Sequence, residues 1–111
     1  MKGRLTLSAV ARGDRTAAIA RIEEAISACG WLVAARPFSG LYFMFQAELE
    51  TARLGDFAQR LRAAGVMLDE VSAALLEAAE QAADTPRNVS LGVTFPEGDP
   101  NLRHVIPEVP G

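Results

Sequence analysis

The sequence predicts a single α+β domain, because two kinds of hydrophobic periodicity alternate along its 111 residues. Residues 4–12 and 87–96 alternate apolar and polar side chains, as half-buried strands do. Residues 14–30 and 51–65 carry apolar side chains three and four positions apart, which is the spacing of one helix face. Residues 31–50 combine aromatic and branched side chains with a turn signal, which indicates a hairpin.

The first predicted strand, RLTLSAVAR, has two different faces. We expect one face to be buried and the other to be exposed, and their members are Leu5, Leu7, Ala9 and Ala11 against Thr6, Ser8, Val10 and Arg12. The first helix follows, with an apolar stripe made of Ile19, Ile22, Ile26 and Cys29. Asp14 or Thr16 can cap its start, and Gly30 can supply a left-handed exit.

The segment WLVAARPFSGLYFMFQAELE predicts two paired strands joined at Ser39-Gly40. Pro37 has no N–H to donate to a neighbouring strand, so the strand before it belongs at a sheet edge. The second strand alternates, and we predict a core face and an opposite face with the members Leu41, Phe43, Phe45, Ala47 and Leu49 against Tyr42, Met44, Gln46, Glu48 and Glu50.

The second half of the chain predicts two more helices and a last strand. Thr51 is the expected cap of the second helix, and Gly65 is its expected end. We expect residues 66–69 to form an extended link, and the sequence does not decide whether this link is a strand. The third helix has an apolar stripe made of Val71, Leu75, Leu76 and Ala79. The last strand sends to the core the side chains of Val89, Leu91, Val93 and Phe95.

This element order is that of the ferredoxin-like β-α-β-β-α-β sandwich, with an extra helix before the last strand. Right-handed crossovers then place the first and third strands in the middle of a four-stranded antiparallel sheet, with helices on one face. We expect one domain over residues 1–111, with a core at 1–95 and an extended proline-rich C-terminal segment at 96–111.

Composition and charge exclude several classes of function. The net charge is −3, with ten arginines and one lysine, which argues against nucleic-acid binding. No run approaches the ~20 apolar residues of a membrane span, so we expect a soluble, cytoplasmic protein. The abundance of alanine and arginine is typical of a GC-rich bacterial genome. The single cysteine, Cys29, excludes an internal disulfide and a cysteine-rich metal site.

The sheet face that helices leave open is the main candidate surface. It is expected to carry Thr6, Ser8, Val10, Leu32, Ala34, Tyr42, Met44, Gln46, Ser90, Gly92 and Thr94. This set is too apolar for a purely solvated surface, so we predict a homodimer or larger assembly. The predicted interface comprises Thr6, Ser8, Val10, Leu32, Tyr42, Met44 and Thr94, with Val105 and Ile106 of the C-terminal segment. An alternative is a ligand platform on which Tyr42 stacks against a flat molecule.

The turn ARGDRTAAIARI joins the first strand to the first helix, where backbone N–H groups favour anions. A strand, a charged Gly13-Asp14-Arg15 turn, a helix and a strand pair over residues 4 to about 69 together resemble an ACT domain. The resemblance implies binding of an amino acid or a similar metabolite, with Gly13, Asp14, Arg15, Tyr42 and Gln46 as ligand-binding residues. The alternative is a tight turn followed by a helix cap.

The remaining chemically active residues suggest no reaction. Cys29 falls on a buried helix stripe, where a small core residue is expected, and a reactive thiol is the alternative. His104 has no second histidine or cysteine near it, so the sequence predicts neither a metal site nor a cofactor. The segment FPEGDPNLRHVIPEVPG holds four prolines among apolar residues, and we expect 101–109 to pack on the sheet or on another subunit.

Three functions remain open at this stage. The favoured one is a regulatory or small-metabolite-sensing role of the ACT type. The alternative is a structural or interaction protein that docks a partner through the open sheet face and the C-terminal segment. The third is a small enzyme whose site lies at a subunit interface, where Arg36, His104 and a carboxylate would converge. The lack of any catalytic constellation favours a protein that is not an enzyme.

Overall fold

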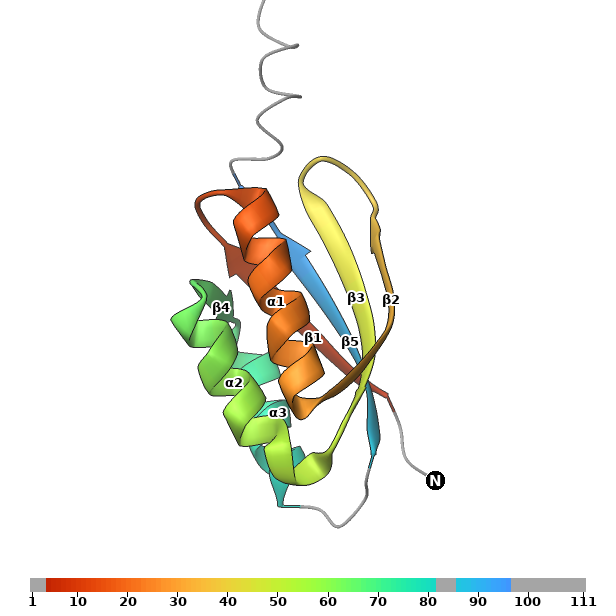
Figure 1. The fold of residues 1–111 in the computed structure, drawn as a ribbon. Helices are drawn as coiled ribbons and strands as arrows, with labels where there is room; N and C mark the ends of the chain where they lie inside the picture. The colour runs from red at the N-terminus through yellow and green to blue at the C-terminus, as the bar shows by residue number, and fades with distance from the viewer. Residues whose placement is uncertain (1–3, 82–85, 97–111) are drawn as a thin grey trace, which may run out of the picture.

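Five strands form one mixed sheet, and helices cover it from one side (Figure 1). The computed structural model describes residues 4–81 and 86–96. In chain order the elements are β1 (Leu5–Ala11), α1 (Arg15–Cys29), β2 (Gly30–Pro37), β3 (Tyr42–Leu49), a 3₁₀ turn η1 (Thr51–Arg53), α2 (Leu54–Ala63), β4 (Val66–Leu68), α3 (Glu70–Glu80) and β5 (Arg87–Thr94).

The strand order is β2-β3-β5-β1-β4, which differs from the predicted one. The α+β class is confirmed, but the four-stranded antiparallel sheet is not. The last strand, β5, lies between β1 and β3, parallel to β1 and antiparallel to β3. The edge beside β1 belongs instead to the short strand β4, at Val66–Leu68, which the sequence left open. The helix α3 then carries the chain to β5, as a crossover into a parallel strand requires.

Burial explains why β5 occupies the middle of the sheet. Residues 89–93 are buried without interruption, on both faces of the strand. Leu91 pairs with Leu7 on one side and with Phe45 on the other, and each of these three side chains is buried. A strand flanked by partners and covered on both faces is the most shielded place in a sheet, which suits the most apolar strand. The predicted inward positions of β5 are confirmed.

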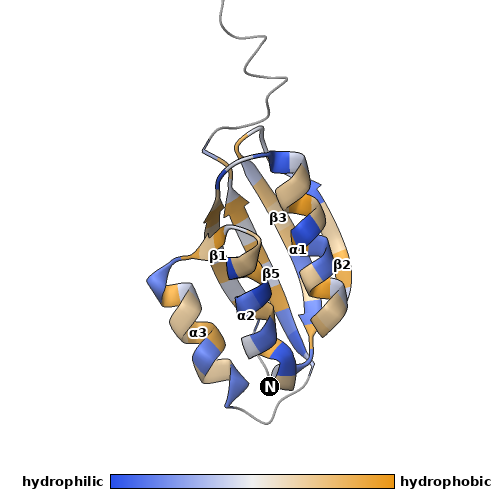
Figure 2. Cartoon of the chain, turned by 60° about the vertical axis from the view of Figure 1, so that its left-hand side comes forward, coloured by the Kyte–Doolittle hydropathy of each residue, from blue (hydrophilic) through white to orange (hydrophobic). Residues whose placement is uncertain are grey.

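The helices α1 and α2 pack side by side against one face of the sheet, which we call the helix face (Figure 1). They bury Ile22, Ile26, Phe57 and Leu61 against it. The helix α3 packs against α2 and along β1, and Figure 2 shows it at one side of the sheet. The predicted stripe of α1 is confirmed, with Cys29 buried and Ile19 partly buried.

Three helix boundaries depend on local chemistry. Asp14 caps α1, since its carboxylate accepts a hydrogen bond from the Ala17 N–H at 2.9 Å. Gly30 does not supply a left-handed exit, because its φ of 173° is extended backbone; a Cβ there would collide with the Glu48 carbonyl oxygen. Thr51 does not cap α2 either. It is buried at the start of the 3₁₀ turn, and Gly65, at φ +82°, follows the end of α2 as predicted.

The hairpin of β2 and β3 is confirmed, but it contains a β-bulge between Leu32 and Ala34. The extra residue reverses the alternation of side chains along β2. Leu32 therefore lies opposite Ala47 on the helix face and packs against the core, so its predicted place on the open face is wrong. Leu41 is also misplaced in the prediction, because it precedes β3 and is exposed.

The helix α3 turns a different side to the core from the one predicted. Its buried residues are Ser72, Leu76 and Ala79, whereas Val71 is 69% exposed and Leu75 is exposed as well. The reason is a hydrogen bond of 2.8 Å from the Ser8 N–H to the Ser72 hydroxyl oxygen. The strand β4 is only three residues long, so Ser72 takes the place that the next strand residue would have.

Several expectations fall on residues 97–111 and so lie outside the described residues. These are the packing of the C-terminal segment at 101–109, the interface roles of Val105 and Ile106, and the position of His104. Among the residues that are described, no helix has the length and apolar character needed to cross a membrane.

Phe45→Ala tests the importance of the row Leu7–Leu91–Phe45. Phe45 is 1% exposed, so its truncation leaves a cavity in the middle of the core. We expect a loss of about 3–5 kcal/mol in the free energy of unfolding, measured by denaturant titration with Trp31 fluorescence. A loss below about 1 kcal/mol would mean that Phe45 is not a core residue.

Ser72→Ala tests the link between α3 and the edge of β1. The substitution leaves the Ser8 N–H without its partner, and we expect a loss of about 1–3 kcal/mol in stability. The control is Ser27→Ala, since Ser27 is exposed on α1 and alanine is a better helix former there. An equal effect of the two substitutions would contradict the bridging role of Ser72.

Candidate functional site: the open sheet face

The sheet face opposite α1 and α2 is called the open face here. Directly paired residues share a face, so the register defines its members. They are Thr6, Ser8 and Val10 of β1, Trp31, Ala34 and Arg36 of β2, Tyr42, Met44, Gln46 and Glu48 of β3, Met67 of β4, and Asn88, Ser90, Gly92 and Thr94 of β5. Six of the predicted interface residues therefore do share one face, and the exception in the described part is Leu32.

One end of the open face carries a row of side chains that runs from the residue after β2 across β3, β5, β1 and β4. We call it the apolar row, and it consists of Phe38, Tyr42, Thr94, Val10 and Met67. Phe38 is 62% exposed and Met67 is 60% exposed. The rings of Phe38 and Tyr42 are 5.8 Å apart between centroids and tilted by 58°. Val10 is 38% exposed, whereas Tyr42 and Thr94 are half-buried.

Tyr42 lies flat on the sheet, over a glycine. A Cβ added at Gly92 would collide with the Tyr42 hydroxyl group, so the tyrosine ring occupies the space that a side chain would fill. Gly92 is buried as a result, although it faces the open side. A glycine within a central strand is otherwise unfavourable, and this close approach accounts for it.

Beside the apolar row, the open face contains a small hollow of about 140 Å³. It is lined by Ala34, Arg36, Phe38, Met44 and Gln46. Of the predicted ligand-binding residues, Gln46 thus contributes to the hollow, and Tyr42 adjoins it through its ring contact with Phe38. Arg36 was not predicted as a ligand residue of the ACT type, although the alternation that places Ala34 on this face places Arg36 there as well.

The predicted anion-binding turn lies on the other side of the sheet. Gly13 has a φ of +90°, and the Asp14 carboxylate is engaged as the cap of α1. The Arg15 guanidinium lies over the rings of Phe43 and Phe95, at 5.6 Å and 5.4 Å from their centroids. Phe43 faces away from Tyr42 along β3, so the structure does not bring Gly13, Asp14 and Arg15 together with Tyr42 and Gln46.

Cys29 has the surroundings of a structural thiol. It is buried, and its Sγ lies 3.9 Å from the Asp56 Oδ2. Burial and then the negative charge of Asp56 raise the pKa of the Cys29 thiol, against the weaker opposing effect of Arg60 and Arg53. A raised pKa disfavours the thiolate, which is the nucleophilic form.

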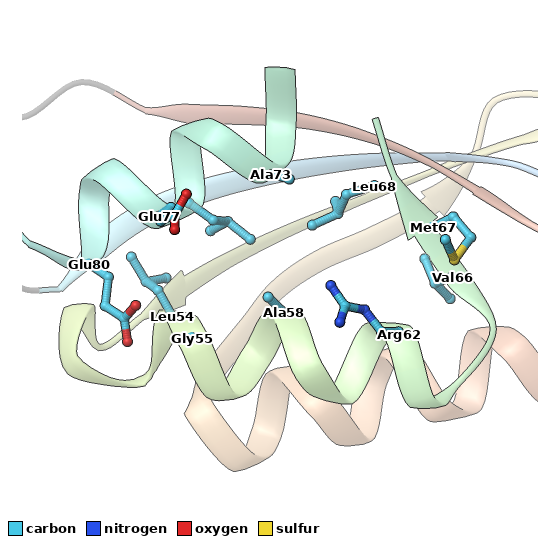
Figure 3. Close-up of a pocket in the computed structure, with 11 residues that line it drawn as sticks. Leu54, Gly55, Ala58, Arg62, Val66, Met67, Leu68, Ala73, Glu77 and Glu80 are labelled. Carbon is cyan, nitrogen blue, oxygen red and sulfur yellow. The ribbon is translucent and has the colours of Figure 1, made fainter. Parts of the chain in front are cut away.

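A second concavity lies on the helix side, between α2, α3 and β4 (Figure 3). Its volume is about 300 Å³, and its walls include Leu54, Ala58, Leu68 and Leu76. Glu77 and Glu80 lie toward one end and Arg62 toward the other. The Glu80 carboxylate occupies the space that a Cβ at Gly55, in the first turn of α2, would fill. This groove could not be predicted from the sequence, because it depends on where α3 packs.

No group of three or more His, Cys, Asp or Glu side chains gathers into a metal-ligating cluster within residues 4–81 and 86–96. Comparison of the chain with family models, with curated proteins and with solved structures found no match. The function is therefore argued from the surface itself.

Gly92→Ala tests the packing of Tyr42 on the strand. The new methyl group must displace the ring, and we expect a loss of about 1–3 kcal/mol in stability. Tyr42→Ala removes the obstacle, so Gly92→Ala should cost much less in a Tyr42→Ala background. The measurement is a double-mutant cycle by denaturant unfolding, and additive effects would show that the two residues do not touch.

Proposed function

We propose that this protein is a binding module whose open face receives an amphipathic helix of a partner protein along the apolar row. The observation that carries the proposal is the row itself. Phe38, Val10 and Met67 are exposed apolar side chains, and the half-buried Tyr42 and Thr94 lie between Phe38 and Val10. This interpretation corresponds to the interaction protein considered from the sequence.

The dimensions of the apolar row suit a helix. Its five positions span four inter-strand spacings of about 4.8 Å, or roughly 19 Å. A helix rises about 1.5 Å per residue, so roughly 13 residues cover this length and present anchors three and four positions apart. Phe38 at one end and Met67 at the other are the most exposed members. Methionine adapts its shape to a partner, which suits the end of such a groove.

The surroundings of the row favour a partner with acidic side chains near one end. Arg36 is exposed on β2, beside Phe38 and Met44. The middle of the face is neutral and polar, with Thr6, Ser8 and Gln46 available as hydrogen-bonding groups. Acidic side chains on the partner helix would meet Arg36 and fix the direction in which the helix lies.

A small carboxylate is the second candidate ligand, and it would occupy the hollow beside the row. The hollow offers the Arg36 guanidinium, the Gln46 amide and the apolar side chains of Phe38 and Met44. A cation and an amide next to apolar walls match a small organic acid with one hydrophobic group. A metabolite-sensing role of the ACT type, if this chain has one, would use this hollow.

The helix-docking proposal is tested with a synthetic amphipathic peptide of about 14 residues, with leucines spaced three and four positions apart and glutamates elsewhere. We expect binding by calorimetry, with amide NMR shifts centred on the apolar row. Met67→Asp should weaken binding about tenfold, because it places a charge inside the contact. The control is Val71→Asp, which adds the same charge at an exposed apolar residue of α3.

No detectable binding, or an equal loss in the Met67→Asp and Val71→Asp proteins, would reject the apolar row as a helix-docking site. The second candidate is tested with benzoate and with free amino acids. Shifts confined to Ala34, Met44 and Gln46 that disappear in Arg36→Gln, but persist in the exposed-arginine control Arg21→Gln, would favour the small-ligand function.

A further inference from the structure

The strand β2 lies at an edge of the sheet, and its outer side pairs with no strand in the described part of the chain. It is eight residues long, and the stretch Gly30–Ala35 carries no charge. Trp31 is 49% exposed and Val33 is 57% exposed. A long, apolar and unpaired edge is a ready template for another strand, and its backbone and side chains determine which partner fits.

The backbone groups that point outward follow from the hairpin ladder. The Glu50 N–H donates to the Cys29 carbonyl at one end, and the Phe38 N–H donates to the Tyr42 carbonyl at the other. Hydrogen-bonded and non-hydrogen-bonded pairs alternate between these two ends, apart from the bulge. The residues whose backbone groups point away from β3 are therefore Gly30, Leu32, Ala35 and Pro37. Of these, Gly30 already donates its N–H to the Ile26 carbonyl at the end of α1.

The bulge sets the side-chain faces in an unusual order. Before it, Gly30 and Leu32 face the helix side and Trp31 faces the open side. After it, Ala35 and Pro37 face the helix side, while Ala34 and Arg36 face the open side. The order of side-chain faces along β2 is therefore the same when it is counted from either end of the strand toward the point between Val33 and Ala34.

A strand with this order is complementary to a second copy of itself. In an antiparallel pair, residues directly opposite each other must point to the same face. Two copies of β2 can lie side by side and antiparallel, with the two-fold axis beside the point between Val33 and Ala34. In this register the facing pairs are Gly30 with Pro37, Trp31 with Arg36 and Leu32 with Ala35. Each of these pairs has matching faces, and the full eight-residue strand is paired. A regular strand without the bulge would bring opposite faces together in this register.

We propose that β2 pairs with β2 of a second copy of this chain in this antiparallel register, which joins two sheets into one across a two-fold axis. The outward backbone groups fit the register. Leu32 and Ala35 exchange two hydrogen bonds, and the two-fold axis produces this pair twice. Gly30 and Pro37 lie opposite each other without a hydrogen bond, because the Gly30 N–H donates to the Ile26 carbonyl. Pro37 has no N–H, so the ladder ends with it on both copies.

The charges on the open face favour the same arrangement. Arg36 of one copy lies opposite Trp31 of the other. On its other side, that tryptophan is paired with Glu48 of its own chain. The guanidinium can therefore stack on the indole ring and approach the carboxylate beyond it. Within a single chain Arg36 is paired with Met44 instead, four strand positions away from Glu48. The two-fold axis produces this contact twice.

The opposite edge of the sheet prevents further growth. The strand β4 is three residues long, and α3 packs along β1 beyond it. Pairing through β2 therefore closes a dimer and does not extend into a fibre. This proposal does not depend on the proposed function, because its backbone pairing uses the strand edge and none of the five residues of the apolar row. Arg36 is the one side chain that both proposals use.

The test is the mass of the full chain by light scattering and sedimentation at micromolar concentration. We expect twice the monomer mass of 11.8 kDa, with Trp31 fluorescence shifting to longer wavelength on dilution. Ala35→Pro removes an outward N–H without removing a bond to β3, and it should give a monomer with unchanged circular dichroism.

A charge swap tests the register independently of the proline variant. Arg36→Glu and Glu48→Arg should each weaken the dimer about tenfold, because each brings like charges together. The double variant R36E/E48R should recover the dimer, since the opposite charges meet again. The control, Arg21→Glu, reverses an exposed charge on α1 and should leave the dimer unchanged.

Three results would overturn the proposal. They are a monomeric wild-type protein at these concentrations, a dimer that Ala35→Pro leaves intact, and a charge-swapped protein that stays as weak as the single variants. Failure of the peptide to bind the apolar row would leave the dimer unaffected, so the two proposals are tested separately.

Discussion

The insertion of β5 between β1 and β3 is the constraint on which the rest of the structure depends. It separates β1 from β3, places Leu91 between Leu7 and Phe45, and buries β5 on both faces. On the open-face side, Tyr42 lies over Gly92 and covers that position. The outer edge of β1 is then left for β4 and Ser72. The core, the open face and the edge of the sheet thus follow from one placement.

Much of the local structure could be predicted from the sequence. Alternation placed Leu5, Leu7, Phe45 and Leu91 in the core, because a period of two is a property of the strand itself. The strand order could not be obtained in this way, since pairing partners are set by competition among distant segments. The three residues Val66–Leu68 were too few to show a period, yet they take the edge that the prediction gave to the last strand.

The candidate site could be predicted from the sequence to the same extent as the local structure. The residues of β1 and β3 that share the open face follow from periodicity, and Thr6, Val10, Tyr42 and Met44 do lie together. Periodicity fails at Leu32, because one bulged residue reverses the strand and only the structure locates it. The Gly13-Asp14-Arg15 turn shows a different limit. Its charges resemble those of a ligand site, but helix capping engages Asp14 and ring stacking engages Arg15.

The central position of β5 also bears on how the chain acquires its structure during synthesis. The β2–β3 hairpin is local and can form as soon as residue 49 is available. The strands β1 and β3, however, leave the ribosome before β5, and their facing edges have no partner until residues 87–94 arrive. Contacts that close over so much of the sequence are slow to form. The nascent chain therefore carries two open strand edges through most of its translation, which is the period when contact with other unfinished chains or with chaperones matters most.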